Sequence, residues 1–277
     1  VTEGVLLSLV AATVVALLVG ILLARTITNP IKALTMATTA VAAGELGRQV
    51  NVQSKDEIGV LATSFNQMSS DLAQASQQRR QMTADIAHEL RTPLSIILGY
   101  TESLRDGILP PDTETFEILH DEAEHLSRLV QDLRTLSLAE AGKLALHPQE
   151  MSPLELLALV VSKYRHQAEQ QNVTLTLSAA ENLPEIDVDQ GRMVQVLGNL
   201  VSNALRFTPA NGEIGLTAVQ PDPNHIQLAV QDNGAGIPAD ILPKVFDRFY
   251  KADESRQAHE GESGLGLAIA RSIVLMH

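Results

Sequence analysis

The feature that most constrains this chain is an uncharged run of about twenty residues from Val5 to Ala24. A helix of that length rises about 30 Å, which is the thickness of the hydrocarbon core of a bilayer. A buried core helix would be less uniformly apolar, and a signal peptide would carry a basic leader and a cleavage site. We therefore expect a transmembrane helix. Because Arg25 and Lys32 follow the run, the positive-inside rule predicts that the rest of the chain is cytoplasmic.

Length and composition limit what can follow the run. The chain has 277 residues, which predicts two or three modules, and its first residue, Val1, indicates a fragment of a longer protein. Only 3% of the residues are aromatic, which favours long helices over a β-sandwich. The absence of cysteine excludes disulfides, cysteine-ligated zinc and thiol catalysis. The net charge of −13 argues against non-specific nucleic-acid binding, because a polyanion would be repelled.

Two amphipathic segments come next. Pro30 can begin a helix that Gly44 and Gly47 end. Asp56-Glu57-Ile58-Gly59 introduces a second helix, in which apolar residues recur at alternating spacings of 4 and 3: Leu61, Phe65, Met68, Leu72 and Ala75. Such spacing is typical of bundles, and two short helices cannot bury their apolar faces alone. We expect a homodimeric four-helix bundle, with a plain coiled-coil spacer as the alternative.

A histidine lies on the outer face of the helix that follows. The buried side of that helix is expected to consist of a row of apolar residues: Ile86, Leu90, Ile97 and Leu104. At about 100° per residue, His88 lies about 160° from the nearest members of this row and should point to solvent. Glu89 adjoins the histidine, Thr92 shares its face one turn later, and Pro93 is expected to kink the helix. Taken alone, an exposed histidine is most often an ordinary surface residue.

A second helix should pair with the first. Residues 106–112 have the composition of a turn. The helix after them carries an apolar face over several turns: Phe116, Leu119, Ala123, Leu126, Leu129, Leu133 and Leu136. Two antiparallel helices form a hairpin, and two hairpins form a dimeric four-helix bundle. His88 would then lie outside the bundle, where another domain can reach it.

The last part of the chain has a mixed pattern. Residues 154–171 and 188–207 are expected to be helices, and residues 173–177, 213–219 and 226–230 alternate like strands. This order predicts an α/β sandwich with one helical layer.

One helix of this region carries amide side chains on a single face. Asn199 and Asn203 lie four residues apart, with Arg206 and Phe207 further along the same helix. Amide oxygens can ligate Mg²⁺ when phosphates and water complete its octahedron, and an arginine can bind a phosphate. Without other signals, two such asparagines are more often caps or surface residues.

Two glycine-rich stretches follow. In the first, residues 232–236, the carboxylate of Asp232 at a strand end can accept a hydrogen bond from the adenine amine, while Gly234 and Gly236 let the backbone approach a ring. A plain Asn-Gly turn is the alternative. The second, residues 261–267, offers backbone N–H groups and a helix N-terminus to phosphates. It is not a Walker A loop, because no Gly-Lys-Ser/Thr ends it.

Taken in order, these motifs resemble those of a membrane-bound sensor histidine kinase of two-component signalling, over essentially everything from Val5 to His277. The matched motifs are the HAMP domain (25–72), the H-box (85–94), the N-box (195–207), the first glycine box (232–236), the F-box (246–250) and the second glycine box (261–267).

The resemblance implies a multidomain fold. Its parts are a transmembrane helix (1–24), an all-α HAMP signal-relay domain (25–76), a dimerisation and histidine phosphotransfer domain that forms a dimeric four-helix bundle (77–147), and an α/β sandwich ATP-binding domain of the Bergerat or GHKL type (148–277). We expect this last domain to be incomplete at its C-terminal end.

The resemblance also implies roles for the motif residues. His88 would be the phospho-acceptor, and Glu89 the base that deprotonates or orients its ring. Thr92 would orient a water for dephosphorylating a regulator, with a bond back to its own helix as the alternative. Lys251 to Glu260 would form an ATP lid.

ATP and Mg²⁺ are the implied ligands, with Asp232 at adenine and Asn203 as the metal ligand. The implied binding residues are Asn199, Asn203, Arg206, Phe207, Asp232, Gly234, Gly236, Gly261, Gly264, Leu265 and Gly266. The implied partners are a second copy of the chain, the aspartate of a response regulator, and the lipid bilayer through Val5–Ala24, with no nucleic acid. The implied location is the inner or plasma membrane of a bacterium, with the kinase region in the cytoplasm.

The sequence leaves two other interpretations open. One is a non-catalytic membrane signal relay with a degenerate nucleotide domain, against which the retained His88, Asn203 and Asp232 argue. The other is an ATPase of the chaperone or topoisomerase type. It would explain only the part after Pro148 and would carry a catalytic carboxylate in place of Asn199.

Overall fold

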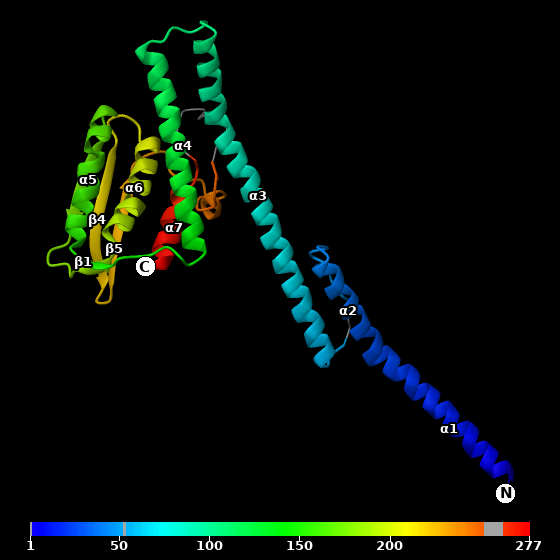
Figure 1. Cartoon of the computed structure of the whole chain (residues 1–277). Coiled ribbons are helices and arrows are strands. Elements are labelled where there is room, and N and C mark those ends of the chain that lie inside the picture. Colours follow the sequence, from blue (N-terminus) through cyan, green and yellow to red (C-terminus); the bar gives the residue numbers. More distant parts are fainter. Residues whose placement is uncertain (1, 52–53, 252–262) are drawn as a thin grey trace. The chain divides into compact units, whose positions relative to one another are not determined.

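The computed structural model describes residues 2–51, 54–251 and 263–277 of the chain. Its helices and strands are labelled in Figure 1. The chain forms two compact units, Val1–Ala84 and Asp85–His277, and each is described by itself. Helix α3 belongs to both, because it begins at Glu57 and ends at Arg105.

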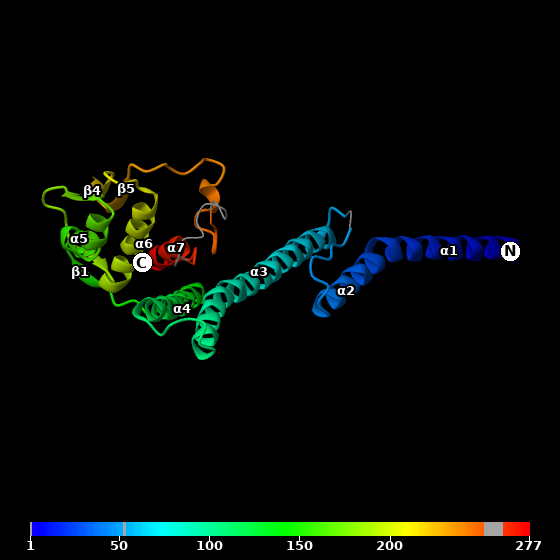
Figure 2. The same ribbon diagram turned by 90° about the horizontal axis from the view of Figure 1, so that it is seen from above.

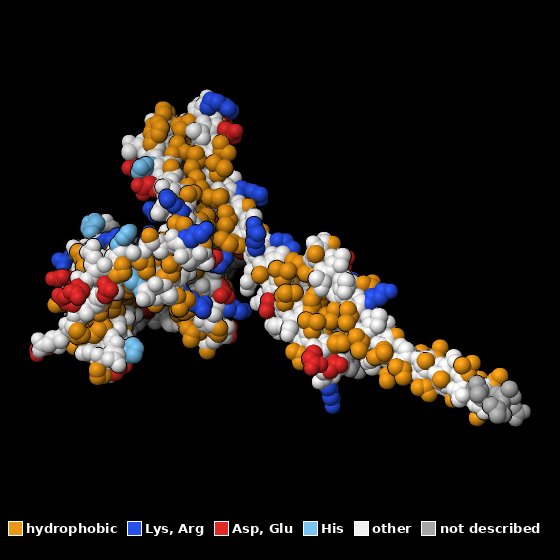
Figure 3. Space-filling view, turned by 60° about the horizontal axis from the view of Figure 1, so that its bottom comes forward, with side chains coloured by type: hydrophobic (Ala, Val, Ile, Leu, Met, Phe, Trp, Pro, Cys, Tyr) orange, Lys and Arg blue, Asp and Glu red, His pale blue; other side chains and the backbone are white. Residues whose placement is uncertain are grey.

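The first unit opens with three consecutive helical elements: α1 (Thr2–Leu23), the π-helical turn η1 (Ala24–Thr28) and α2 (Asn29–Ala42). The helical stretch from Leu6 is long and apolar enough to cross a membrane, by length and composition, with a mean hydropathy of 2.9 and none of its most apolar window buried. The visible face of α1 carries mainly hydrophobic side chains (Figure 3). The predicted apolar helix is present, and Pro30 lies in the first turn of α2 as expected.

A small hydrophobic core joins α2, the connector after it and the beginning of α3. Its buried members are Leu34, Ala37, Val50, Ala62 and Phe65. The connector is held by the amide of Asn66, which accepts a hydrogen bond from the Val50 N–H at 2.7 Å and donates one to the Val50 carbonyl at 3.0 Å. One side chain therefore satisfies both backbone groups of a residue outside regular secondary structure.

The predicted Asp-Glu-Ile-Gly signature does open α3. The Asp56 carboxylate accepts hydrogen bonds from the backbone N–H groups of Ile58 and Gly59 at 3.1 and 3.2 Å. A bond from the Ser54 side chain, followed by that from Gly59, lowers the pKa of Asp56. A Cβ atom on Gly59 would lie 1.9 Å from the Ser54 carbonyl oxygen, so glycine alone fits the close approach.

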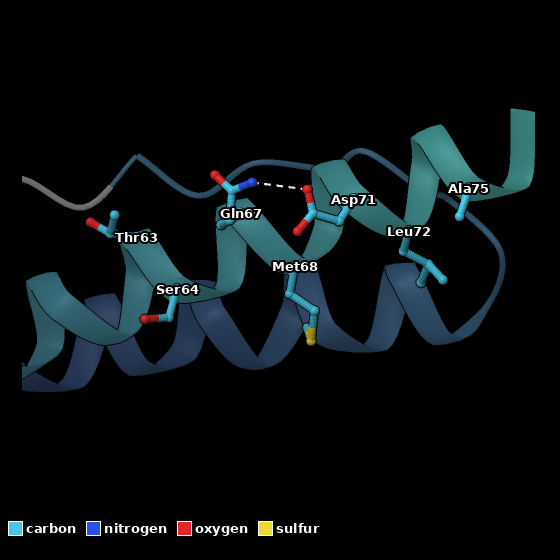
Figure 4. A pocket seen from close by; sticks show the side chains of 7 residues that line it. All are labelled: Thr63, Ser64, Gln67, Met68, Asp71, Leu72 and Ala75. Carbon is cyan, nitrogen blue, oxygen red and sulfur yellow. Dashed lines mark hydrogen bonds between the residues drawn. The ribbon is translucent and has the colours of Figure 1, made fainter. Parts of the chain in front are cut away.

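The apolar row predicted for the start of α3 is divided in the structure. Phe65 is 7% exposed and packs in the core, whereas Leu61, Met68 and Leu72 are 56%, 53% and 44% exposed. Met68, Leu72 and Ala75 lie together along an open groove of about 800 Å³ that Thr63, Ser64, Gln67 and Asp71 also line (Figure 4). Within one chain, α3 therefore turns one face to α2 and leaves a second apolar face uncovered.

The second unit begins with the rest of α3, which passes through Pro93 as a continuous helix. After a turn, α4 (Thr113–Glu140) follows, so the predicted helix, turn and helix are present. The side chain of Asp112 caps α4 by accepting from the Thr115 N–H at 2.9 Å, and this bond is the main reason that the pKa of Asp112 is lowered. The predicted apolar face of α4 is only partly covered within one chain, because Leu136 is 1% exposed but Phe116 is 54% exposed.

The remainder of the second unit is the predicted α/β sandwich. Its helices are α5 (Pro153–Gln170), α6 (Gln190–Phe207), the short 3-10 helix η2 (Leu242–Lys244) and α7 (Gly266–Met276). Its main sheet has the order β2 (Thr174–Ala179), β4 (Glu213–Asp222), β5 (His225–Asp232), in which β2 is parallel and β5 antiparallel to β4. Helices α5 and α6 pack on one face of this sheet (Figure 2). The sequence did not predict a second, two-stranded sheet of β1 (Gln149–Met151) and β3 (Ile186–Val188).

A hydrophobic cluster connects α4 with the sandwich. Its buried members are Leu129, Leu136, Ala139, Leu144, Val196, Leu265, Ile269, Ala270 and Ile273, with Leu90 of α3 packed against them. The cluster contains residues of α4, α6 and α7. The α3–α4 hairpin and the α/β sandwich therefore share one core.

Candidate phospho-acceptor and nucleotide site

His88 is exposed on α3, as the helical periodicity predicted, and its neighbours Ile86 and Leu90 are half-buried. Thr92 is also exposed, and its hydroxyl donates to the carbonyl of His88 at 3.5 Å. That distance is at the limit for a hydrogen bond, so the hydroxyl is only weakly engaged by its own helix. His88 is therefore open to reaction from the outer face of α3.

Glu89 has a partner that the sequence did not predict. Both of its carboxylate oxygens accept from the ammonium group of Lys251, at 3.0 and 3.1 Å. The Lys251 and Glu89 side chains are 35% and 20% exposed. The resemblance places Lys251 in the lid, and no local signal links two residues that are 162 positions apart. The rest of the expected lid, residues 252–260, lies outside the described residues.

The N-box and the second glycine box meet through a side chain. Asn199 and Asn203 both project from α6 and are half-buried. The amide nitrogen of Asn199 donates to the carbonyl oxygen of Gly266, the first residue of α7, at 2.8 Å. Asn199 thus contacts the second glycine box directly, and this contact uses one of the two N–H donors of its amide. Arg206 lies over the Phe207 ring, with its guanidinium carbon 5.4 Å from the ring centroid.

The first glycine box is packed against the end of α6. Asp232 is exposed at the end of β5, and one of its carboxylate oxygens accepts from the Gly234 N–H at 2.9 Å. A Cβ atom on Gly234 would lie 2.4 Å from the Phe207 carbonyl oxygen. Gly236 has a φ of 72° with open space around it, so this glycine serves the backbone conformation. The Asp232 carboxylate is therefore held near the end of α6, the helix that carries Asn203 and Arg206.

The second glycine box is only partly described, because Gly261 lies outside the described residues. Gly264 has a φ of 65°, and a Cβ atom there would lie 2.9 Å from the backbone of Phe249. The side chain of Leu265 is 0% exposed and belongs to the shared core. The prediction that Leu265 binds the nucleotide is therefore narrowed to its backbone, because its side chain anchors the loop in the core. The Leu265 N–H donates to the Ser263 hydroxyl at 3.4 Å, a distance at the limit for a hydrogen bond.

The residues at the nucleotide site, with Asn203 as the proposed ligand, fit a magnesium ion that is bound together with phosphates. Among residues 2–51, 54–251 and 263–277, no group of three His, Cys, Asp or Glu side chains could hold a metal ion. Mg²⁺ in nucleotide sites takes most of its ligands from phosphates and water, so one amide oxygen such as that of Asn203 is sufficient from the protein.

Asp189 is a further organising residue, which the sequence motifs do not indicate. Its carboxylate accepts from the backbone N–H groups of Arg192 and His147 at 3.0 and 2.9 Å, and its own N–H donates to the His277 ring at 3.1 Å. Partial burial opposes the charged form, but these two backbone bonds and the positive charge of Arg192 outweigh it and lower the pKa of Asp189. Asp189 thereby joins the linker after α4 to the start of α6.

Family models match the chain in the same order as these sites. The HAMP domain matches residues 22–74, the His Kinase A (phospho-acceptor) domain matches residues 78–142, and the Histidine kinase-, DNA gyrase B-, and HSP90-like ATPase matches residues 188–277. The first two matches exclude a chaperone or topoisomerase ATPase, which would account for the third alone. A phospho-acceptor hairpin and a nucleotide-binding sandwich that follow a HAMP domain define the histidine kinase class. The chain belongs to the sensor histidine kinases of two-component systems.

Two curated relatives illustrate the similarity. Signal transduction histidine-protein kinase BaeS of Escherichia coli (strain K12) is 37% identical over 266 residues, which are 96% of this chain and 56% of the relative. Sensor histidine kinase YclK of Bacillus subtilis (strain 168) is 32% identical over 280 residues, 98% of this chain and 59% of the relative. The chain thus spans a little over half the length of these relatives.

Solved structures give the same class. The Acinetobacter baumannii histidine kinase AdeS matches with a TM-score of 0.58 and 30% identity, over 68% of this chain and 86% of that one. Full-length ShkA in complex with AMPPNP matches with a TM-score of 0.53 and 28% identity, over 71% of this chain and 41% of that one. Histidine kinase ThkA in complex with the response regulator protein TrrA matches with a TM-score of 0.52 and 25% identity, over 65% of this chain and 55% of that one.

Proposed function

We propose that this protein phosphorylates itself on His88 from ATP and passes the phosphoryl group to an aspartate of a response regulator. The observation that carries the proposal is the joining of two parts by one hydrophobic core. An exposed histidine lies on one part, and the glycine and asparagine motifs of a nucleotide site converge on the other. The family membership supports the same reaction, and the proposal gives the enzyme the activity of an ATP-dependent protein-histidine kinase.

The transfer is an in-line displacement. The lone pair on the far ring nitrogen of His88 forms a bond to the γ-phosphorus, while the bond from that phosphorus to the bridging oxygen breaks and its electron pair leaves with ADP. The proton on the near ring nitrogen passes to the carboxylate of Glu89, the next residue in the chain, and then to water. Positioning of the two reactants supplies most of the rate enhancement in phosphoryl transfer.

Different residues would bind the adenine and the phosphates of the nucleotide. Asp232 would accept a hydrogen bond from the adenine amine, since only one of its oxygens is engaged by Gly234. The backbone around Gly264 and Gly266 would face the phosphates, with Arg206 and Phe207 at the end of α6 beside them.

The remaining binding residues complete the nucleotide site. Mg²⁺, held by Asn203 and phosphate oxygens, would neutralise the phosphate charge when bound. Asn199 would support the phosphate-binding loop through its bond to Gly266. Gly236 and Gly261 complete the proposed set.

Thr92 is proposed to act in the reverse direction, on the phosphorylated regulator. Its hydroxyl lies one turn from His88, is exposed and is only weakly bonded to the His88 carbonyl at 3.5 Å. It can therefore orient a water for hydrolysis of the regulator's acyl phosphate at little cost. The relative ThkA, which was solved in complex with a response regulator protein, supports a partner of this class.

The functional protein is proposed to be a homodimer in a bacterial inner or plasma membrane, with its kinase region in the cytoplasm. The apolar groove along Met68, Leu72 and Ala75 (Figure 4) and the exposed Phe116 on α4 are surfaces that a second copy would cover in two four-helix bundles. The apolar α1 would hold the dimer in the bilayer. We propose domain boundaries at residues 24, 76 and 147.

The test is incubation of the full chain, in detergent or nanodiscs, with γ-labelled ATP and Mg²⁺. Wild type, His88→Gln and Asp232→Ala are compared, with His225→Gln, at an exposed hairpin histidine, as the matched control. Acid-labile, alkali-stable label is expected in wild type and control and is lost in the other two variants. An unlabelled wild type under several stimuli would support the non-catalytic relay instead.

A further inference from the structure

Asn233, the second residue of the first glycine box, makes contacts that the proposed function does not use. The backbone N–H of Glu213 donates to its side-chain oxygen at 2.9 Å, and its own N–H donates to the Glu213 carbonyl at 3.3 Å. Glu213 is the first residue of β4, and β5 ends at Asp232. The two residues therefore pair one position beyond the last regular pair of the ladder, which joins Ile214 to Asp232.

This last pair is closed by a side chain. In a regular antiparallel pair of this kind, the two residues exchange backbone N–H and carbonyl groups. Here the side-chain oxygen of Asn233 takes the place of its backbone carbonyl, so the Glu213 N–H is satisfied while the chain leaves the sheet. The chain turns at once, because the next N–H, that of Gly234, donates back to the Asp232 carboxylate.

The Asn233 oxygen also lies against the loop that follows α6. A Cβ atom on Gly212 would lie 2.8 Å from this oxygen. The loop is held on both sides: the Thr208 hydroxyl donates to a carbonyl of α6 at 2.7 Å, and the Thr174 N–H of β2 donates to the Gly212 carbonyl at 2.9 Å. Asn233 therefore has a fixed neighbour, and this neighbour is continuous with the helix of the N-box.

We propose that Asn233 is a positioning residue for adenine recognition: its side-chain oxygen fixes the end of β5 and so directs the Asp232 carboxylate toward the adenine amine. Without this oxygen, the exposed Glu213 N–H would bond to water, and β5 would lose its last connection to β4. The carboxylate would then be directed by its bond to Gly234 alone. The inference rests on the proposed function and concerns the base specificity of the same site.

The test measures the Kd values of ADP and of inosine diphosphate, each with Mg²⁺, by calorimetric titration of the full chain in detergent or nanodiscs. Inosine carries an oxygen in place of the adenine amine and cannot donate there to a carboxylate. The proteins are wild type, Asn233→Ala, Asn233→Asp, Asp232→Ala and the double variant Asp232→Ala/Asn233→Ala. Asn224→Ala, at an exposed hairpin asparagine whose side chain forms no hydrogen bond with a described residue, is the matched control.

The expected change is selective for adenine. Loss of one hydrogen bond predicts that Asn233→Ala raises the Kd of ADP about two- to tenfold. The Kd of inosine diphosphate should stay unchanged, which also shows that the variant is folded. Asn233→Asp keeps the acceptor oxygen and should keep the preference for ADP. In the Asp232→Ala background, Asn233→Ala should add nothing, because Asn233 acts through that carboxylate.

Three results would overturn the inference: unchanged ADP binding in Asn233→Ala, equal losses for the two nucleotides in that variant, or a loss in Asn233→Asp as large as in Asn233→Ala. If wild type prefers ADP and Asp232→Ala abolishes the preference, these results leave the proposed role of Asp232 intact. A wild type without preference for ADP overturns both. Label on His88 from γ-labelled ATP tests the proposed kinase activity independently of base preference.

Discussion

Replacement of Gly234 by alanine tests whether the first glycine box and the end of α6 form one nucleotide site. The added Cβ would lie 2.4 Å from the Phe207 carbonyl oxygen and 2.9 Å from a carboxylate oxygen of Asp232, whereas real Cβ atoms essentially never come within 3.0 Å of such atoms. The nearest atom belongs to the backbone, so no side-chain rotation can relieve the contact. The end of β5 and the end of α6 must separate, and Asp232 must move with them.

The size of the effect follows from the packing. Forcing one extra carbon into a filled contact costs about 1–3 kcal/mol. If that strain falls on the nucleotide-bound geometry, the Kd for a nucleotide rises about fivefold to more than a hundredfold, because each 1.4 kcal/mol is a factor of ten. We expect a rise in Kd at the upper end of this range, because the displaced carboxylate is also the proposed adenine acceptor.

The assay is calorimetric titration of the full chain with AMPPNP and Mg²⁺, together with urea unfolding of the unliganded protein. Gly191→Ala is the matched control. Its Cβ would meet its nearest neighbour, an Asp189 oxygen, at an ordinary 3.5 Å, and it lies in the first turn of α6, where alanine is preferred to glycine. Wild-type affinity in Gly234→Ala would refute the close contact, and equal losses in both variants would show a non-specific effect.

Two further perturbations test the shared core and its linker. The Leu136 side chain is 1% exposed in the core between α4 and the sandwich, so Leu136→Ala should lower the free energy of unfolding of the second unit in urea by about 2–5 kcal/mol. Leu242→Ala, at a side chain that is 53% exposed, should lower it little. Similar losses in the two variants would contradict the shared core. The pKa of Asp189 is lowered from its ordinary 3.8 in the folded state, so its stabilising effect is present above that pH and is lost as the pH falls through the lower folded-state pKa. Asp189→Asn should therefore lower Tm near neutral pH and converge on wild type in acid, and a difference that does not change with pH would contradict the role of its charge.

Much of the architecture could be predicted from local patterns. The run from Val5 to Ala24 is helical because length and uniform apolarity decide that outcome without help from the rest of the chain. The exposure of His88 follows from the 3.6-residue period of the helix that carries it. The start of α3 follows from an aspartate that bonds to the N–H groups of the next turn and a glycine that leaves room for the chain. In each case the interacting groups are within a few residues of one another.

Periodicity does not identify which neighbour covers each apolar position. The row from Leu61 to Ala75 was predicted to be buried in a dimeric bundle, and within the single chain α2 covers Phe65 while Leu61, Met68 and Leu72 are exposed, so their burial by a second copy stays a prediction. The pattern of apolar residues records that a helix has buried positions, but it does not say which neighbour buries each one.

The sequence by itself determined the order of the modules, the outward position of His88 and the motifs that surround a nucleotide. The tertiary structure alone decided what those motif residues touch. Asn199 is bonded to a backbone 67 residues away, and Glu89 is bonded to Lys251 across 162 residues. Contacts at such separations depend on how helices and strands pack, and no spacing along the chain encodes them. The proposed base and acceptor could therefore be read from the sequence, whereas the lysine that holds the base could not.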